Sequence, residues 1–167
     1  MNDREATPAD AAAIDALFRE SFAATFAHLY APEDLASFFA GFTVAGWTGE
    51  LASPDFAFRV IEDGEGLAGY CKLGPTSLPV TPEGPAIELR QLYLRDRAKG
   101  SGAAQTLMGW ALATARARGA AELWLSVYID NHRARRFYQR YGFEDRGPYA
   151  FMVGNHADED RLMRLAL

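Results

Sequence analysis

The apolar residues near the start of the chain recur at helical spacing. Residues 14–22 place apolar side chains at intervals of three or four positions, which predicts an amphipathic helix that begins at Thr7 and Pro8. A second helix is predicted from Pro32, and residues 43–51 are expected to add one or two helical turns. The aromatic side chains of this region are predicted to form core, and the alternative is the wall of a substrate cavity.

From Phe56 onward the apolar positions alternate with a period of two. Residues 56–61 and 67–73 flank a glycine-rich turn, which predicts a β-hairpin, and residues 3–6 predict a short first strand. Residues 74–85 contain four prolines and are expected to form a surface loop, because proline neither continues a helix nor donates within a sheet. The middle of the chain is therefore predicted to belong to a β-sheet.

A strand, a helix and a second strand follow in succession. Residues 86–94 and 123–127 are the predicted strands, and the helix between them begins after Gly102 and ends at Gly119. A βαβ unit of about 40 residues requires a right-handed crossover between parallel strands. These two strands are therefore expected to be parallel neighbours in an α/β protein.

The end of the chain is predicted to add one helix and two strands. Asn131 is a favourable helix N-cap, and Gly142 is a favourable helix end. Residues 143–154 and 160–167 are then predicted to form the final pair of strands.

Composition and charge exclude several classes of protein. A chain of 167 residues that is 49% hydrophobic fits a single domain with a sizeable core. Its net charge of −5 argues against a nucleic-acid partner. Residues 2–5 do not resemble a signal peptide, and no apolar run approaches the ~20 residues that span a bilayer, so we expect a cytoplasmic protein with no membrane partner.

Cysteine and histidine give no sign of a disulfide or a metal site. Cys71 is the only cysteine and lies in a predicted strand, where a lone cysteine is usually a small buried hydrophobe. His28, His132 and His156 lack the spacing of metal ligands. No bound metal is therefore expected.

The turn Gly100-Ser101-Gly102 joins the strand 86–94 to the next helix. Such a junction directs several free backbone N–H groups at one point, which favours a phosphate. A P-loop would require Lys-Ser or Lys-Thr after the last glycine, whereas Lys99 precedes both glycines. Gln105 breaks the dinucleotide fingerprint, and Ser101 lacks the flanking glycines of a serine-nucleophile elbow. A tight turn that holds no ligand is the remaining alternative.

Two motifs around this turn resemble those of a known family. Arg97-Ala98-Lys99-Gly100-Ser101-Gly102 is similar to the Arg/Gln-x-x-Gly-x-Gly/Ala signature of the GNAT N-acetyltransferase superfamily. The segment 131–143 resembles the Asn-x-x-Ala-x-x-Phe-Tyr-x-x-x-Gly-Phe signature, and 87–94 resembles the family's fourth strand. Scattered residues in the opening helices and at 151–154 are similar to a bacterial subgroup, the PaiA-type polyamine N-acetyltransferases.

The resemblance implies a fold and a cofactor. The implied fold is a single GNAT domain over residues 1–167, with a mixed, twisted sheet of about seven strands that splays between the fourth and fifth and about four flanking helices. The implied cofactor is acetyl-CoA, with its pantetheine arm along the fourth strand and its pyrophosphate at the glycine turn. The implied contacts are Leu92, Tyr93, Leu94, Arg97, Lys99, Gly100, Ser101, Gly102, Ala103, Ala104, Asn131, Arg133 and Tyr138.

Some of these contacts have a second interpretation. Arg97 and Lys99 could belong to a solvated surface instead of lying near phosphate. Asn131 is both a helix N-cap and an implied cofactor contact. Arg133 and Arg136 could reach the 3′-phosphate of the nucleotide or form a solvated face.

The resemblance also implies direct transfer of an acetyl group to an amine. An alkylammonium of pKa ~10.4 is neutral in only about 4 parts in 10⁴ at pH 7, so losing its proton adds roughly 4.6 kcal/mol to the barrier. Glu88 is the predicted base, and its alternatives are an ordinary strand glutamate or an ion pair with Arg90. Tyr138 is the predicted acid for the CoA thiolate, and its alternative is a core aromatic.

The acceptor is expected to be a small-molecule primary amine similar to a polyamine. The acidic balance and the PaiA-type resemblance favour this class. The alternatives are a protein, peptide or amino-acid acceptor and, from another class, a non-catalytic module that senses acetyl-CoA. The presence of both Glu88 and Tyr138 argues against the sensor, and members of the family often form homodimers.

Overall fold

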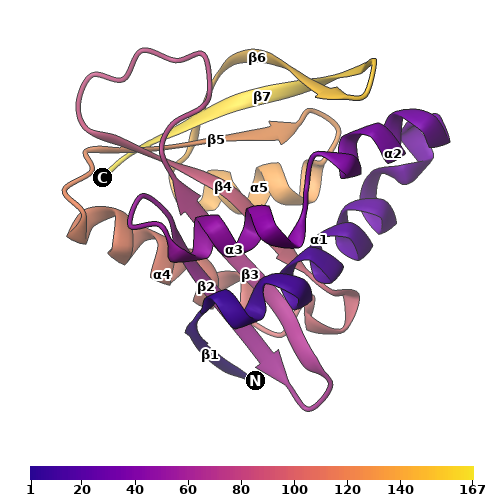
Figure 1. Ribbon diagram of the computed structural model, residues 1–167. Helices are drawn as coiled ribbons and strands as arrows, with labels where there is room; N and C mark the ends of the chain where they lie inside the picture. Colours follow the sequence, from indigo (N-terminus) through magenta and orange to yellow (C-terminus); the bar gives the residue numbers. More distant parts are fainter.

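Seven strands form one mixed sheet in the computed structural model, which describes residues 1–167 (Figure 1). The order of the strands is β1-β2-β3-β4-β5-β7-β6, and only β4 and β5 are parallel neighbours. The predicted βαβ unit is therefore confirmed. The strands are β1 (Asn2–Glu5), β2 (Ala57–Asp63), β3 (Gly66–Gly74), β4 (Ala86–Leu94), β5 (Glu122–Tyr128), β6 (Glu144–Val153) and β7 (His156–Ala166).

Five α-helices accompany the sheet, together with three short 3₁₀ segments. The helices are α1 (Ala11–Phe26), α2 (Pro32–Ala40), α3 (Val44–Ala52), α4 (Ala103–Ala117) and α5 (His132–Arg140). The 3₁₀ segments are η1 (Pro8–Asp10), η2 (Ala27–Leu29) and η3 (Asp96–Ala98). The segment expected to add one or two turns is the separate helix α3, because the Thr43 hydroxyl accepts a hydrogen bond from Gly46 N at 3.0 Å and caps its first turn.

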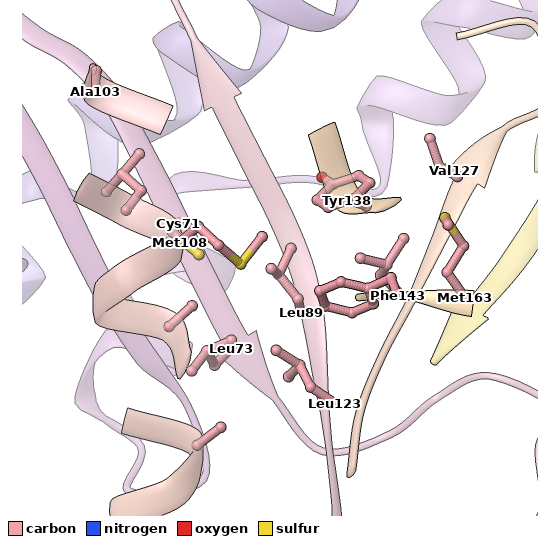
Figure 2. Packing of buried hydrophobic residues seen from close by; sticks show 14 of the residues in the cluster. Cys71, Leu73, Leu89, Ala103, Met108, Leu123, Val127, Tyr138, Phe143 and Met163 are labelled. Carbon is pink, nitrogen blue, oxygen red and sulfur yellow. The ribbon is translucent and has the colours of Figure 1, made fainter. Parts of the chain in front are cut away.

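The two faces of the sheet carry separate hydrophobic cores. In Figure 1, α1 and α3 cross in front of the strands, whereas α4 and α5 lie behind them. The core under α1 and α3 contains Phe18, Phe22 and Trp47, so the predicted core role of these aromatic residues is confirmed, but Phe18 and Phe22 also line a cavity, as the alternative expected. The core under α4 and α5 contains Leu107 and the strand residues drawn in Figure 2.

β4 and β5 pair only at their beginnings and then separate. Their parallel register covers Ala86 to Glu88, whereas β4 stays paired with β3 as far as Leu94. A register shift opposite Lys72 and Leu73 leaves Arg90 as an extra residue of β4. Such a bulge increases local twist, and it lies where the two strands diverge. The expected splay between the fourth and fifth strands is therefore present.

The last hairpin differs from the prediction at the start of β7. This strand begins at His156, not at residue 160, because Asp158 and Asp160 continue its alternation although both are acidic. The hairpin turn rests on α2, where Asp34 Oδ1 accepts a hydrogen bond from Asn155 N at 2.9 Å. A Cβ atom at Gly154 would lie 2.6 Å from Asp34 Cα, so the close approach requires glycine.

None of the helices of the fold is both long and apolar enough to cross a bilayer.

Candidate active site

A cavity of about 660 Å³ opens where β4 and β5 separate. Its walls come from α1, α2, the second half of β4 (residues 89–94), the start of α4, the end of β5, α5, β6 and the start of β7. This volume lies within the range of roughly 300–1,000 Å³ that is typical of small-molecule sites. The cavity joins segments from both halves of the chain.

One end of the cavity is built from the glycine turn and the N-terminus of α4. Gly100 has φ +79° and Gly102 has φ +92°, conformations that glycine adopts without strain. The backbone N–H groups of Gly100, Gly102, Ala104 and Gln105 donate to no acceptor in the protein. Four free donors beside the positive end of a helix dipole are the arrangement that phosphate oxygens prefer, so this end of the cavity can accept a phosphate.

The other predicted residues of this turn have different surroundings. The Ser101 hydroxyl donates to Ala98 O at 2.7 Å and accepts from Ala103 N at 3.3 Å, so it stabilises the turn from within. The Arg97 guanidinium donates to Asp63, the last residue of β2, at 2.7 Å. Lys99 lies in the cavity wall, whereas Arg97, Ser101, Gly102 and Ala103 do not. Arg97 is therefore directed at a carboxylate and not at the cavity.

Basic side chains of α5 extend this end of the cavity. Arg133, Arg136 and Arg140 lie in the wall, and none of them forms an ion pair with a carboxylate of the protein. Asn131 caps the helix, since its Oδ1 accepts from Ala134 N at 3.3 Å. It also lies in the cavity wall, which is compatible with both of its predicted roles.

The open edge of β4 runs from this basic end toward Tyr138. Leu92, Tyr93 and Leu94 pair with β3 on one side, and no strand pairs with them on the other. All three lie in the cavity wall. Their unpaired backbone groups can bind an extended chain that carries amides, as an added strand would.

Tyr138 lies in the wall of the cavity, between the separated strands. Figure 2 shows it near Leu89 and Phe143, in the space between the separated strands, and its ring centroid is 5.7 Å from that of Phe143. Its side chain lies in the cavity wall, and no protein group forms a hydrogen bond with its hydroxyl. Burial raises the pKa of Tyr138, so the phenol keeps its proton at neutral pH. The side chain is thus both part of the core and a free proton donor.

Glu88 is not brought into this cavity. Its Oε1 accepts hydrogen bonds from Ser77 N and Ser77 Oγ, each at 3.0 Å, and its Oε2 lies 3.5 Å from Arg90 Nε. Glu88 is buried but absent from the cavity wall, which contains Leu89 and Arg90 from the same strand. The predicted base therefore occupies a neighbouring polar site.

Two carboxylates that sequence reasoning missed lie at the other end of the cavity. Asp158 and Asp160 of β7 are in its wall and are each only 6% exposed. Burial, with a contribution from the Asp158 charge, raises the pKa of Asp160 to about 7. Asp158 accepts hydrogen bonds from the Tyr30 hydroxyl and from His156 Nε2, the latter at 3.1 Å. A signal was present in the sequence, because Asp158, Asp160 and the core residue Leu162 alternate with a period of two.

Known proteins share this architecture. A model of the acetyltransferase (GNAT) family matches residues 12–143. An uncharacterized N-acetyltransferase of Mycobacterium tuberculosis is 36% identical over 134 residues, which cover 80% of this chain and 82% of that protein. The structure of PaiA N-acetyltransferase from Thermoplasma acidophilum in complex with coenzyme A has a TM-score of 0.79 at 20% identity and covers 99% of this chain and 98% of its own. Ribosomal-protein-alanine N-acetyltransferase from Brucella melitensis has a TM-score of 0.70 at 23% identity and covers 100% of both chains.

The splayed sheet and the glycine turn define an acetyltransferase fold. The chain belongs to the GNAT acetyltransferase family, since the family model matches most of it, and it is an N-acetyltransferase. Members of this family use acetyl-CoA as the acetyl donor. The name of the Brucella protein gives an alanine of a ribosomal protein as its acceptor, whereas the name of the Thermoplasma protein gives no acceptor, so the shared fold leaves the acceptor of this protein open.

Proposed function

We propose that the protein transfers the acetyl group of acetyl-CoA directly to a small primary amine of the polyamine type. The observation that carries this proposal is the composition of the cavity. The glycine turn with its free backbone donors, the arginines of α5, Tyr138, and two carboxylates among aromatic rings all contribute to this one cavity. An anionic donor and a cationic acceptor would each meet the opposite charge, and their reactive groups would meet at Tyr138.

The residues present fit acetyl-CoA. The free N–H groups of Gly100, Gly102, Ala104 and Gln105 would bind the pyrophosphate, and Arg133 or Arg136 would lie near the nucleotide phosphate. The open edge of β4 would bind the amides of the pantetheine arm. When bound, acetyl-CoA supplies the activated acetyl group as a thioester. Arg97 and Ser101 support the turn and are not assigned a direct contact.

Tyr138 is the proposed general acid. Its phenol keeps its proton at neutral pH and has no partner in the protein, so it is free to donate to the departing thiolate. In the overall reaction, one ammonium and one thioester give one amide, one thiol and one released proton. The nitrogen loses two protons: one is released, and the departing thiolate gains the equivalent of the other.

Two carboxylates are candidates for the base that takes the proton of the acceptor ammonium. Glu88 matches the position that the family resemblance implies, but Ser77 and Arg90 occupy its oxygens. Asp160 lies in the cavity wall itself. A role for Glu88 would require water to connect it with the acceptor.

The experiment that tests the proposed function separates binding from chemistry. Isothermal titration measures the affinity for acetyl-CoA, and a thiol reagent measures CoA release over a panel of amines, with mass spectrometry of the acetylated product. We expect tight binding and CoA release with primary alkylamines. Binding without thiol release from any amine or peptide would support the acetyl-CoA sensor instead. Faster release with peptides than with alkylamines would support a peptide acceptor.

A further inference from the structure

We propose that Asp160, with Asp158 beside it, binds the ammonium group of the acceptor and takes the proton that the nitrogen must lose before acetyl transfer. The acceptor class is a diamine or another alkylamine that has no carboxylate near its reactive nitrogen. This inference rests on the proposed function and extends it by naming the acceptor site.

The positions of the two carboxylates follow from the register of β7. Asp158 and Asp160 are two residues apart on one strand, so their side chains share a face of the sheet. Tyr128 of β5 lies directly opposite Asp160, and Phe151 of β6 lies opposite Asp158. All four side chains lie in the wall of the cavity that contains Tyr138.

Asp160 is the buried carboxylate that lacks a counterion or a backbone donor. Glu122 binds Arg164 at 3.0 Å, Glu88 binds Ser77 and Arg90, and Asp158 binds Tyr30 and His156. The Ser126 hydroxyl is the one group that favours the charged form of Asp160, and no lysine, arginine or histidine acts on it. A buried carboxylate without a cation is costly, and an ammonium ligand would remove that cost.

Aromatic rings form the rest of this end of the cavity. Phe26 and Tyr128 pack edge to face at 6.0 Å, and Tyr30 packs against His156 at 5.3 Å. Rings of this kind exclude water and interact favourably with a cation, while their hydrocarbon surface accommodates an alkyl chain. The site therefore matches a cation attached to an apolar chain.

The charges of the cavity wall come from different elements. Lys99, Arg133, Arg136 and Arg140 lie near the start of α4 and on α5, Arg90 lies on β4 and is engaged with Glu88 and Pro75 O, and Asp158 and Asp160 lie on β7. An acceptor that carries its own carboxylate, such as an amino acid, would be repelled by the two aspartates. A second ammonium group would instead be attracted by the second aspartate.

The proton transfer is a balanced step. One N–H bond of the ammonium breaks, its proton passes to a carboxylate oxygen of Asp160, and the nitrogen keeps the electron pair for bond formation. The pKa of Asp160 is raised to about 7. It is therefore closer to the pKa of an alkylammonium than the pKa of an ordinary aspartate is, and proton transfer from the ammonium to Asp160 is less unfavourable. The groups that face Asp160 are Asp158 and the hydroxyls of Ser126, Tyr30, Tyr93 and Tyr128.

The test compares Asp160→Asn with a matched control, Glu159→Gln. Glu159 is the next residue of β7, but its side chain is 58% exposed and points to the other face. We expect Asp160→Asn to lower kcat/KM for 1,4-diaminobutane at pH 7 by about 10²-fold or more and Glu159→Gln to keep the wild-type value. Acetyl-CoA affinity, measured by titration, should stay within about threefold in both variants, because the phosphate donors are unchanged.

The pH profile separates proton transfer from simple loss of structure. The wild-type kcat/KM should rise tenfold per pH unit below about pH 7 and then level off, because Asp160 must be ionised to take the proton. In Asp160→Asn it should continue to rise up to about pH 10, because only the free amine then reacts. Titration of 1,4-diaminobutane into the CoA-bound protein measures acceptor binding without turnover. We expect Asp160→Asn to bind the diamine at least about tenfold more weakly than the wild type does.

Three acceptors of similar length test the charge selection. The order of kcat/KM should be 1,4-diaminobutane, then butylamine, then 4-aminobutanoate, with about tenfold or more between the last two. Wild-type activity and an unchanged pH profile in Asp160→Asn would overturn the inference, as would equal rates with 4-aminobutanoate and butylamine. A loss of about 10²-fold in Glu88→Gln alongside an active Asp160→Asn would assign the base to Glu88. Absence of CoA release from every amine in the wild type would refute the proposed function itself.

Discussion

The burial of Asp160 should cost stability, and the cost should depend on pH. The carboxyl is 6% exposed and has no cation to compensate its charge. Asparagine has nearly the same shape and carries no charge. We therefore expect Asp160→Asn to unfold at a higher temperature than the wild type at alkaline pH, even though the variant loses activity.

The magnitude follows from the pKa of Asp160 in the folded and unfolded chains. Folding raises it from 3.8 to about 7, so the folded state binds more protons between these values and stability falls as pH rises through that window. The cost is absent well below pH 4 and complete above pH 7, where it amounts to roughly 4 kcal/mol. About 2.7 kcal/mol of it develops between pH 5 and pH 8.5.

The assay is urea unfolding of the wild type and Asp160→Asn at pH 5 and at pH 8.5, with Glu159→Gln as the control. We expect the stability advantage of Asp160→Asn to grow by about 1 to 3 kcal/mol between the two pH values, because most of the charge on Asp160 develops within this range. For a chain of this size each kcal/mol corresponds to about 2–4 °C in Tm. Comparison at two pH values cancels any packing effect of the amide.

Two results would refute this reasoning. A stability difference that is the same at both pH values would mean that the Asp160 charge is not buried. An Asp160→Asn protein that is less stable than the wild type at pH 8.5 would mean that the carboxylate makes a favourable interaction in the folded state. The inference that Asp160 binds a cationic ligand would then lose its energetic basis.

Further predictions concern the proposed acetyl-CoA site, the proposed general acid Tyr138 and the helix α4 that follows the glycine turn. Tyr138→Phe should lower kcat by about 10²-fold in CoA-release assays while acetyl-CoA affinity stays within a few-fold, and an unchanged kcat would remove Tyr138 from the mechanism. Gly102→Ala should weaken acetyl-CoA binding by about tenfold in titrations, because φ +92° is strained for alanine, whereas Gly64→Ala in the β2–β3 turn should not. Gly109→Ala in α4 should stabilise the protein by about 0.5–1 kcal/mol in urea unfolding, since the added methyl meets open space and only helix propensity changes; a loss of stability would contradict this. Arg136→Ala should weaken acetyl-CoA binding and reduce its salt dependence, and an unchanged affinity at low salt would assign Arg136 to a solvated face.

Local patterns were sufficient for the elements that surround the glycine turn. The period of the apolar residues and the positions of Gly102, Gly119 and Asn131 predicted the β4-α4-β5-α5 succession close to its observed bounds. These signals depend on neighbouring residues, and so a sequence contains them directly. The start of β7 was missed because the acidic residues before position 160 interrupt the apolar pattern used to recognise a strand.

The roles of single side chains depend on partners that are distant in the sequence. Arg97 was a candidate phosphate ligand, but Asp63 from the preceding hairpin binds it. Glu88 was the predicted base, but the loop residue Ser77 binds its oxygens. Such pairings form only when separate elements pack together, and no local pattern specifies them.

The sequence by itself determined the family, the order of the elements and the position of the glycine turn, because these features are encoded in short motifs and in periodicity. Tertiary structure decided which charges share the cavity. It brings Asp158 next to Tyr30, 128 residues earlier in the chain, and it leaves Asp160 buried without a cation. The glycine turn and its flanking motifs are thus readable from sequence alone, whereas the proposed acceptor site exists only where β7 packs against the opening helices.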